Sequence, residues 1–114
     1  MAATDQLVID VRRDEGTVVL ALSGELDLAT APLLQSEIQS SEVETATMVV
    51  LDLQALKFID STGLRVLLTA HAQSRERGQQ FAVTRGSPQV QRLLSITGVG
   101  EHLRIIAPGD ELLV

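Results

Sequence analysis

The hydrophobic pattern of the first 24 residues predicts a β-hairpin. Residues 6–13, QLVIDVRR, alternate apolar and polar side chains, which is the period of a half-buried strand. Residues 17–24, TVVLALSG, form a second apolar segment of strand length. Between them stand Asp14, Glu15 and Gly16, residue types that favour turns. The two segments are therefore expected to pair as neighbouring strands.

The rest of the pattern alternates helices with strands. The predicted elements are a helix over 31–41, a buried strand over 47–53, a helix over 62–77 ended by Gly78, a strand over 79–85, a short helix from Ser87 and Pro88, and a strand over 103–107. The order β-β-α-β-α-β-α-β predicts an α/β fold with a mixed, mostly parallel β-sheet and helices packed against it. Parallel strands need long connections, and the predicted helices supply them.

Length and composition are those of one domain with an aliphatic core. The chain has 114 residues and is 45% hydrophobic, with two Phe and no Tyr or Trp. It has no Cys, so neither a disulfide framework nor a thiolate metal site is expected. No apolar run approaches the roughly 20 residues of a membrane span, and the N-terminus does not resemble a signal peptide. These features favour a cytoplasmic protein.

The net charge narrows the range of partners. It is −6 at pH 7, with a pI of about 4.7. An acidic surface repels the phosphates of nucleic acids and of anionic membranes, so neither is an expected partner. The partners that remain are small molecules and other proteins.

Four polar or small residues, Asp60, Ser61, Thr62 and Gly63, stand where the predicted helix 62–77 begins. As an N-cap, the Ser61 hydroxyl would accept a backbone hydrogen bond worth roughly 1 kcal/mol. Glycine costs about 0.5–1 kcal/mol against alanine inside a helix, which suits close approach by another molecule's backbone. Glycine at position 63 would also leave the Ser61 side chain accessible to a kinase. A phosphate added there would be stabilised by the helix N-terminus. The residues alone do not choose between a structural cap and a modification site.

Four segments resemble the STAS domain, a family named from sulfate transporters and anti-sigma factor antagonists. They are 22-LSGELDLATAP-32, 49-VVLDLQALKFIDSTGLRVLL-68, 87-SPQVQRLLSITGV-99 and 103-LRII-106. The resemblance implies one STAS domain over residues 1–114. Many members have a further helix after the last strand, whereas residues 107–114 allow only a turn or so, so that helix is expected to be short or absent.

The resemblance also implies a function, that of an anti-sigma factor antagonist in bacterial transcription regulation. The phosphoacceptor of that branch would be Ser61, with Thr62 the weaker candidate. The implied partners are an anti-sigma factor Ser/Thr kinase of the histidine-kinase-like ATPase type, and a Ser phosphatase. The unphosphorylated form would bind the anti-sigma factor and release the sigma factor. ATP would belong to the kinase, so this chain needs no cofactor.

The docking edge for that partner is expected around the start of the helix. It comprises Glu25, Asp27, Asp60, Ser61, Thr62, Gly63 and Leu64. Asp27 has a simpler role as an N-cap or turn residue, which is slightly favoured over a direct contact. Glu25 and Asp60 would add to an acidic rim that attracts a basic patch.

Other functions remain as alternatives. The same edge would be a constitutive docking surface in a lipid-transport complex or a signalling scaffold. A hydrolase using Ser61 would need a basic side chain beside it, and neither His71, expected to be a packing residue, nor His102 is a strong candidate. Two His and no Cys make a dedicated metal site improbable. No catalytic residue is assigned.

Overall fold

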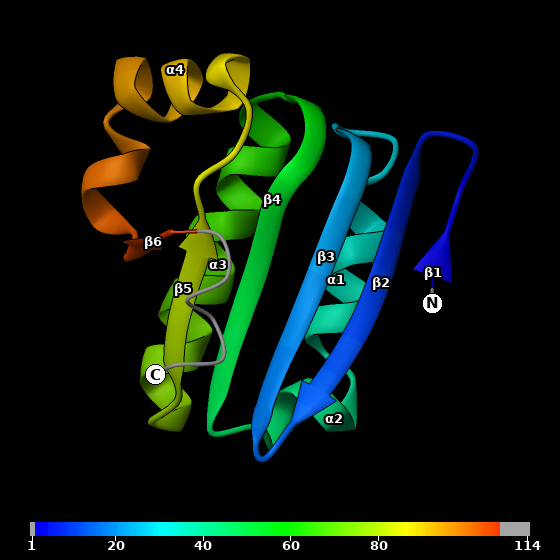
Figure 1. The fold of residues 1–114 in the computed structure, drawn as a ribbon, viewed down its shortest axis with the longest axis vertical. Coiled ribbons are helices and arrows are strands. Elements are labelled where there is room, and N and C mark those ends of the chain that lie inside the picture. The colour runs from blue at the N-terminus through cyan, green and yellow to red at the C-terminus, as the bar shows by residue number, and fades with distance from the viewer. Residues whose placement is uncertain (1, 108–114) are drawn as a thin grey trace.

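The structure of the protein, a computed structural model, describes residues 2–107 and consists of a six-stranded sheet with its main helices on one face (Figure 1). The strands are β1 (Ala2–Ala3), β2 (Leu7–Asp14), β3 (Thr17–Leu26), β4 (Met48–Ile59), β5 (Gln80–Thr84) and β6 (Ile105–Ile106). The helices are α1 (Ala31–Ile38), α2 (Ser41–Glu44), α3 (Ser61–Arg77), α4 (Pro88–Thr97) and the 3-10 helix η1 (Val99–His102). In Figure 1, α1 and α3 lie behind the sheet and α4 lies at its upper end.

The sheet is mixed and mostly parallel, as predicted. Its strand order follows the chain, β1-β2-β3-β4-β5-β6. The expected hairpin is the antiparallel pair of β2 and β3, and β1 adds two residues to its outer edge. From β3 onward each neighbouring pair is parallel. The carboxyl ends of β3, β4 and β5 therefore lie at the same end of the domain.

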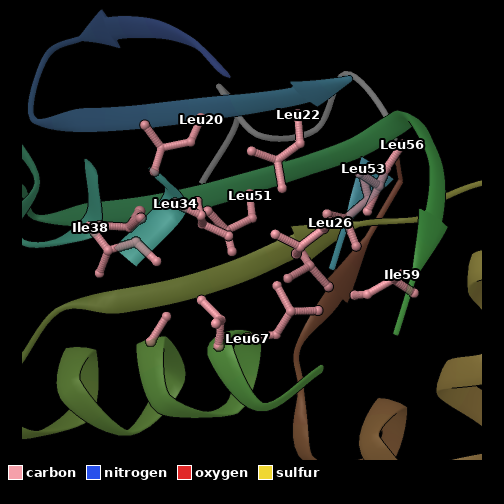
Figure 2. Packing of buried hydrophobic residues seen from close by; sticks show 14 of the residues in the cluster. Leu20, Leu22, Leu26, Leu34, Ile38, Leu51, Leu53, Leu56, Ile59 and Leu67 are labelled. Atoms are coloured by element: carbon pink, nitrogen blue, oxygen red, sulfur yellow. The ribbon is translucent and has the colours of Figure 1, made fainter. Parts of the chain in front are cut away.

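The core is aliphatic, which confirms the expectation from composition. It lies between the sheet and the helices behind it (Figure 2). Leu20 and Leu51 on the sheet, and Leu34 and Leu67 on α1 and α3, have no exposed surface. Burying a leucine side chain contributes roughly 1.5–3 kcal/mol. This packing fixes α1 and α3 against the sheet and thereby the loops that lead into them.

Strand β4 is longer than predicted. The sequence suggested a strand ending at residue 53 and then a short link, but β4 continues to Ile59. Its second half pairs with β3 across two register shifts, ending with Leu26 opposite Ile59. Most residues of this half are exposed, so no alternating apolar pattern marks them as a strand.

A buried polar group lies where β4 separates from β5. The paired positions of β4 and β5 end at Leu51 and Val83. Just beyond, the Thr84 hydroxyl donates to Asp52 Oδ1 at 2.9 Å and accepts from the Leu53 amide at 2.9 Å. Asp52 therefore has a structural role within the long strand β4.

Several element boundaries differ from the prediction. Helix α1 ends at Ile38 instead of residue 41, and the short α2 was not predicted. Gly78 ends α3 in the left-handed conformation with φ of 73°, as expected. Ser87 caps α4 by accepting from the Val90 amide at 3.3 Å, also as expected.

The last predicted strand, 103–107, is reduced to the two residues of β6. The prediction of a short or absent C-terminal helix lies outside the described residues. No helix within residues 2–107 has the length and apolar character needed to cross a membrane.

Candidate functional site

Two loops meet at the carboxyl ends of β3 and β4. Because β3 and β4 are parallel neighbours, the segments that follow them emerge side by side, the usual position of binding sites in α/β sheets. The Asp60 amide donates to the Leu26 carbonyl at 3.2 Å, and the Leu28 amide donates to Asp60 Oδ2 at 3.2 Å. The predicted proximity of the Asp27 loop to the start of α3 is therefore confirmed.

The N-cap of α3 is Asp60 and not Ser61. Asp60 Oδ1 accepts from the Gly63 amide at 2.9 Å, while Asp60 itself has extended backbone geometry. The helix thus starts one residue earlier than expected, at Ser61. Asp60 is better suited than serine because its second oxygen also binds the Leu28 amide. One carboxylate therefore both caps α3 and ties the loop after β3 to it.

Because Asp60 caps the helix, the Ser61 hydroxyl has no structural role. Ser61 is exposed, and its side chain makes no hydrogen bond to any other described residue. It lies in the first turn of a helix of 17 residues, where unpaired amides and the helix dipole favour an added negative charge. Thr62, next to it, is half-buried. Of the two hydroxyls, Ser61 is the accessible one.

Gly63 is required by close packing inside the domain. An added Cβ would lie 2.7 Å from Ile59 Cγ1 and 2.9 Å from both Leu26 Cγ and the Leu26 carbonyl oxygen. The sequence interpretation explained Gly63 by the approach of another molecule's backbone. That interpretation was wrong, because the atoms that lie close to Gly63 belong to Ile59 and Leu26 of this chain. Leu64 is buried as well, with 5% exposure. Gly63 and Leu64 lie beneath the edge and support it from inside.

Asp27 is a turn residue, as the favoured interpretation predicted. Its Oδ1 accepts from the amides of Ala29 and Thr30 at 3.0 and 3.1 Å. The Thr30 hydroxyl donates to the Glu25 carbonyl at 2.9 Å, which closes the loop. The Glu25 side chain itself is exposed. This hydrogen bonding gives the loop beside Ser61 a defined shape.

Two exposed apolar side chains near this site were not singled out from the sequence. Leu28, at the tip of the loop, is 73% exposed, and Phe58, three residues before Ser61, is 49% exposed. Leu28 is a large apolar residue that follows Asp27 in the loop between the two predicted elements, and this was an available signal. Phe58 had none, because its segment was not predicted as a strand.

No arrangement for nucleophilic catalysis surrounds Ser61 within the described residues. His71 lies ten residues further along α3, which is about 15 Å at 1.5 Å per residue. Its ring packs against Phe81 with centroids 5.8 Å apart, and its Nδ1 is buried, which confirms a packing role. Within residues 2–107, no three His, Asp or Glu side chains are grouped as metal ligands would be.

The fold and this pair of loops are those of a STAS domain. The family model described as the STAS domain matches residues 8–109, and the chain belongs to this family. It is 31% identical over 109 residues to the anti-sigma-F factor antagonist RsfB of Mycobacterium tuberculosis, covering 94% of this chain and 87% of that protein. It is 32% identical over 94 residues to an anti-sigma F factor antagonist of Paenibacillus polymyxa, covering 82% of this chain and 80% of that protein.

A solved structure agrees with this relationship. The crystal structure of an anti-sigma factor antagonist from Mycobacterium paratuberculosis superposes with a TM-score of 0.84 at 28% identity, covering 99% of this chain and 97% of that chain. The similarity therefore extends over the sheet, the helices and both loops of the candidate site.

Proposed function

We propose that this protein is a bacterial, cytoplasmic anti-sigma factor antagonist, a regulatory binding protein and not an enzyme. Unphosphorylated, it binds an anti-sigma factor that is also a Ser/Thr kinase of the histidine-kinase-like ATPase type, and the sigma factor is released. Phosphorylation of Ser61 reverses the binding, and a Ser phosphatase restores it. Relatives at 31 and 32% identity are named as such antagonists.

The single observation that carries the proposal is the state of the Ser61 side chain. Its hydroxyl is exposed and has no hydrogen-bonding task among the described residues, because Asp60 caps the helix in its place. Helix propensity alone gives no reason for serine here, since alanine is the better helix former. A free hydroxyl in the first turn of a rigid helix is instead well presented to a kinase.

The chemistry of the switch is a phosphoryl transfer. The Ser61 Oγ attacks the γ-phosphorus of ATP held by the kinase, ADP leaves, and the hydroxyl proton passes to a base of the kinase. The product carries a charge of about −1.5 to −2 in place of a neutral group. The new charge lies one residue from Asp60, and Glu25, opposite Phe58 on the neighbouring strand, adds a second acidic group at this end of the sheet.

The expected effect on binding follows from this change. In an interface formed around a neutral hydroxyl, the phosphate introduces steric overlap, a desolvation cost and repulsion from acidic groups. A loss of about 2.7 kcal/mol corresponds to a hundredfold weaker affinity. The exposed residues of the docking edge, Glu25 and Ser61, would contact the partner directly together with Leu28 beside them, and the half-buried Asp27, Asp60 and Thr62 would lie at the margin of the contact.

A pull-down with four baits tests the proposal. Wild type, Ser61→Ala, Ser61→Asp and the control Ser36→Asp, which adds the same charge at an exposed position of α1, are each incubated with lysate of the source organism. We expect wild type, Ser61→Ala and Ser36→Asp to recover an ATPase-type kinase that Ser61→Asp does not. With ATP, wild type should gain one phosphate on Ser61.

The alternative function gives a different result. If the protein is a constitutive docking subunit of a lipid-transport complex or a signalling scaffold, all four baits recover the same subunits. Ser61 would then be an ordinary surface residue, and the switch would be rejected.

A further inference from the structure

The carboxyl end of β4 and the helix α4 enclose a groove next to the docking edge. The groove is a pocket of about 270 Å³ lined by Lys57, Phe58, Ile59, Gln89, Val90 and Leu93. Ile59 directly precedes Asp60, so the groove and the Ser61 edge share a border. In Figure 1, α4 lies at the upper end of the sheet, and the yellow end where this helix begins is beside the upper end of β4.

Apolar side chains extend from this groove along the outer face of α4. Phe58 in the groove is 49% exposed, and Ile96 on α4 is 68% exposed. Leu93, half-buried, and Ile96 are three positions apart and therefore share one side of the helix. We call Phe58, Leu93 and Ile96 the α4 strip.

The α4 strip suits a protein side chain better than a small molecule. Pockets for small ligands usually enclose most of the ligand, whereas Phe58 in this groove is itself 49% exposed. Exposed apolar groups that adjoin one another often mark contact surfaces. The large exposed hydrophobic residues of the described chain are Leu28, Phe58 and Ile96. Leu28 lies beside the docking edge, and Phe58 and Ile96 belong to the strip.

Charge indicates what the partner presents to the strip. Lys57 lines the groove and Arg92 lies next to Leu93; both are exposed, and neither forms an ion pair within residues 2–107. In a chain of net charge −6, two exposed cations therefore lie beside the strip, and the acidic edge borders it at Glu25, which is opposite Phe58 in the register of β3 and β4. A complementary partner surface carries acidic groups opposite α4 and basic groups opposite the edge.

We propose that the α4 strip is a second contact surface for the anti-sigma factor, which places there a segment with apolar side chains flanked by Asp or Glu. The proposal rests on the proposed function and adds to it a contact outside the first turn of α3. The strip holds the kinase on its substrate through contacts that do not include Ser61. It therefore sets affinity and partner choice, while Ser61 sets the state of the switch.

The test uses the purified kinase recovered by the wild-type bait. The variants are Ile96→Asp and Phe58→Ala, and the matched control is Ser95→Asp, which adds the same charge to the same helix on a neighbouring exposed face. Calorimetry should show Kd raised about tenfold or more, or about 1.4 kcal/mol, for the two strip variants and unchanged for the control. In the phosphorylation assay KM should rise with kcat unchanged, because Ser61 is intact.

A charge reversal provides an independent measurement. Lys57→Glu combined with Arg92→Glu should lower the association rate, and the difference from wild type should shrink as salt is added. Circular dichroism checks that each variant is folded.

Each other outcome has a definite meaning. If wild type binds and is phosphorylated while the strip variants behave like the control, the α4 strip is not a contact surface and the proposed function stands. If wild type binds no anti-sigma factor, the proposed function fails and the strip proposal fails with it. If Ile96→Asp converts a wild-type dimer to a monomer in light scattering without changing kinase binding, the strip is an interface between two copies and the proposal is wrong.

Discussion

Replacing Asp60 tests the most specific structural feature of the site. Asp60→Ala removes both the cap on Gly63 and the acceptor for the Leu28 amide, bonds of 2.9 and 3.2 Å. Loss of an N-cap costs typically about 1 kcal/mol. The Leu28 amide is accessible to water, which replaces part of the lost bond, so its share is about 0.5–1 kcal/mol. We expect a total loss of roughly 1.5–2 kcal/mol in the free energy of unfolding.

Two further variants separate the parts of this effect. Asp60→Asn keeps one acceptor oxygen, which retains the cap, but loses the charge at the helix N-terminus and the bond to Leu28. It should lose about half as much stability as Asp60→Ala. Ser61→Ala removes a hydroxyl with no hydrogen-bonding partner among the described residues, so we expect a change within about 0.5 kcal/mol.

Urea unfolding followed by circular dichroism measures these differences, with thermal unfolding as a check. For a chain of 114 residues, 1 kcal/mol corresponds to roughly 4 °C in Tm, so Asp60→Ala should melt about 6–8 °C lower. The reasoning is refuted if Ser61→Ala is as destabilising as Asp60→Ala, because Ser61 would then be the structural cap.

Two other substitutions test the packing that supports the site. Gly63→Ala places a methyl group within 2.9 Å of both the side chain and the carbonyl oxygen of Leu26, so we expect about 1–3 kcal/mol of destabilisation in urea unfolding; an unchanged midpoint would contradict the internal role of this glycine. Thr84→Val leaves the buried Leu53 amide without its acceptor and removes one of the two donors to Asp52 Oδ1, which should cost about 1–3 kcal/mol; a neutral result would show that water reaches this group.

The order of strands and helices along the chain could be predicted because the sequence signals for each element are local. The apolar run of β4, the helical spacing on α3 and the Ser-Pro start of α4 each identify an element from neighbouring residues alone. The parallel arrangement then follows from the alternation of strands and helices. What was missed depends on tertiary contacts. The second half of β4 is a strand because it pairs with β3 through register shifts, which no local pattern encodes.

The candidate site shows the same division. The Asp-Ser-Thr-Gly segment identified the start of α3, but a shift of one residue exchanged the roles of Asp60 and Ser61. Both residue types are good N-caps, so propensity could not decide between them. The contact of Asp60 with Leu28 spans 32 residues and is visible only in the folded chain. Gly63 was explained by an external partner because Leu26, which packs against it, is also far away in the sequence.

The central claim is that phosphorylation of Ser61 controls binding to an anti-sigma factor, and one measurement tests it directly. The purified kinase phosphorylates wild type with ATP, mass spectrometry locates the phosphate, and calorimetry compares the affinity of the kinase for the modified and unmodified forms. The account predicts a single phosphate on Ser61 and a Kd about a hundredfold higher for the phosphorylated form, or about 2.7 kcal/mol. Equal affinities for the two forms, or a phosphate at a different residue, would contradict it.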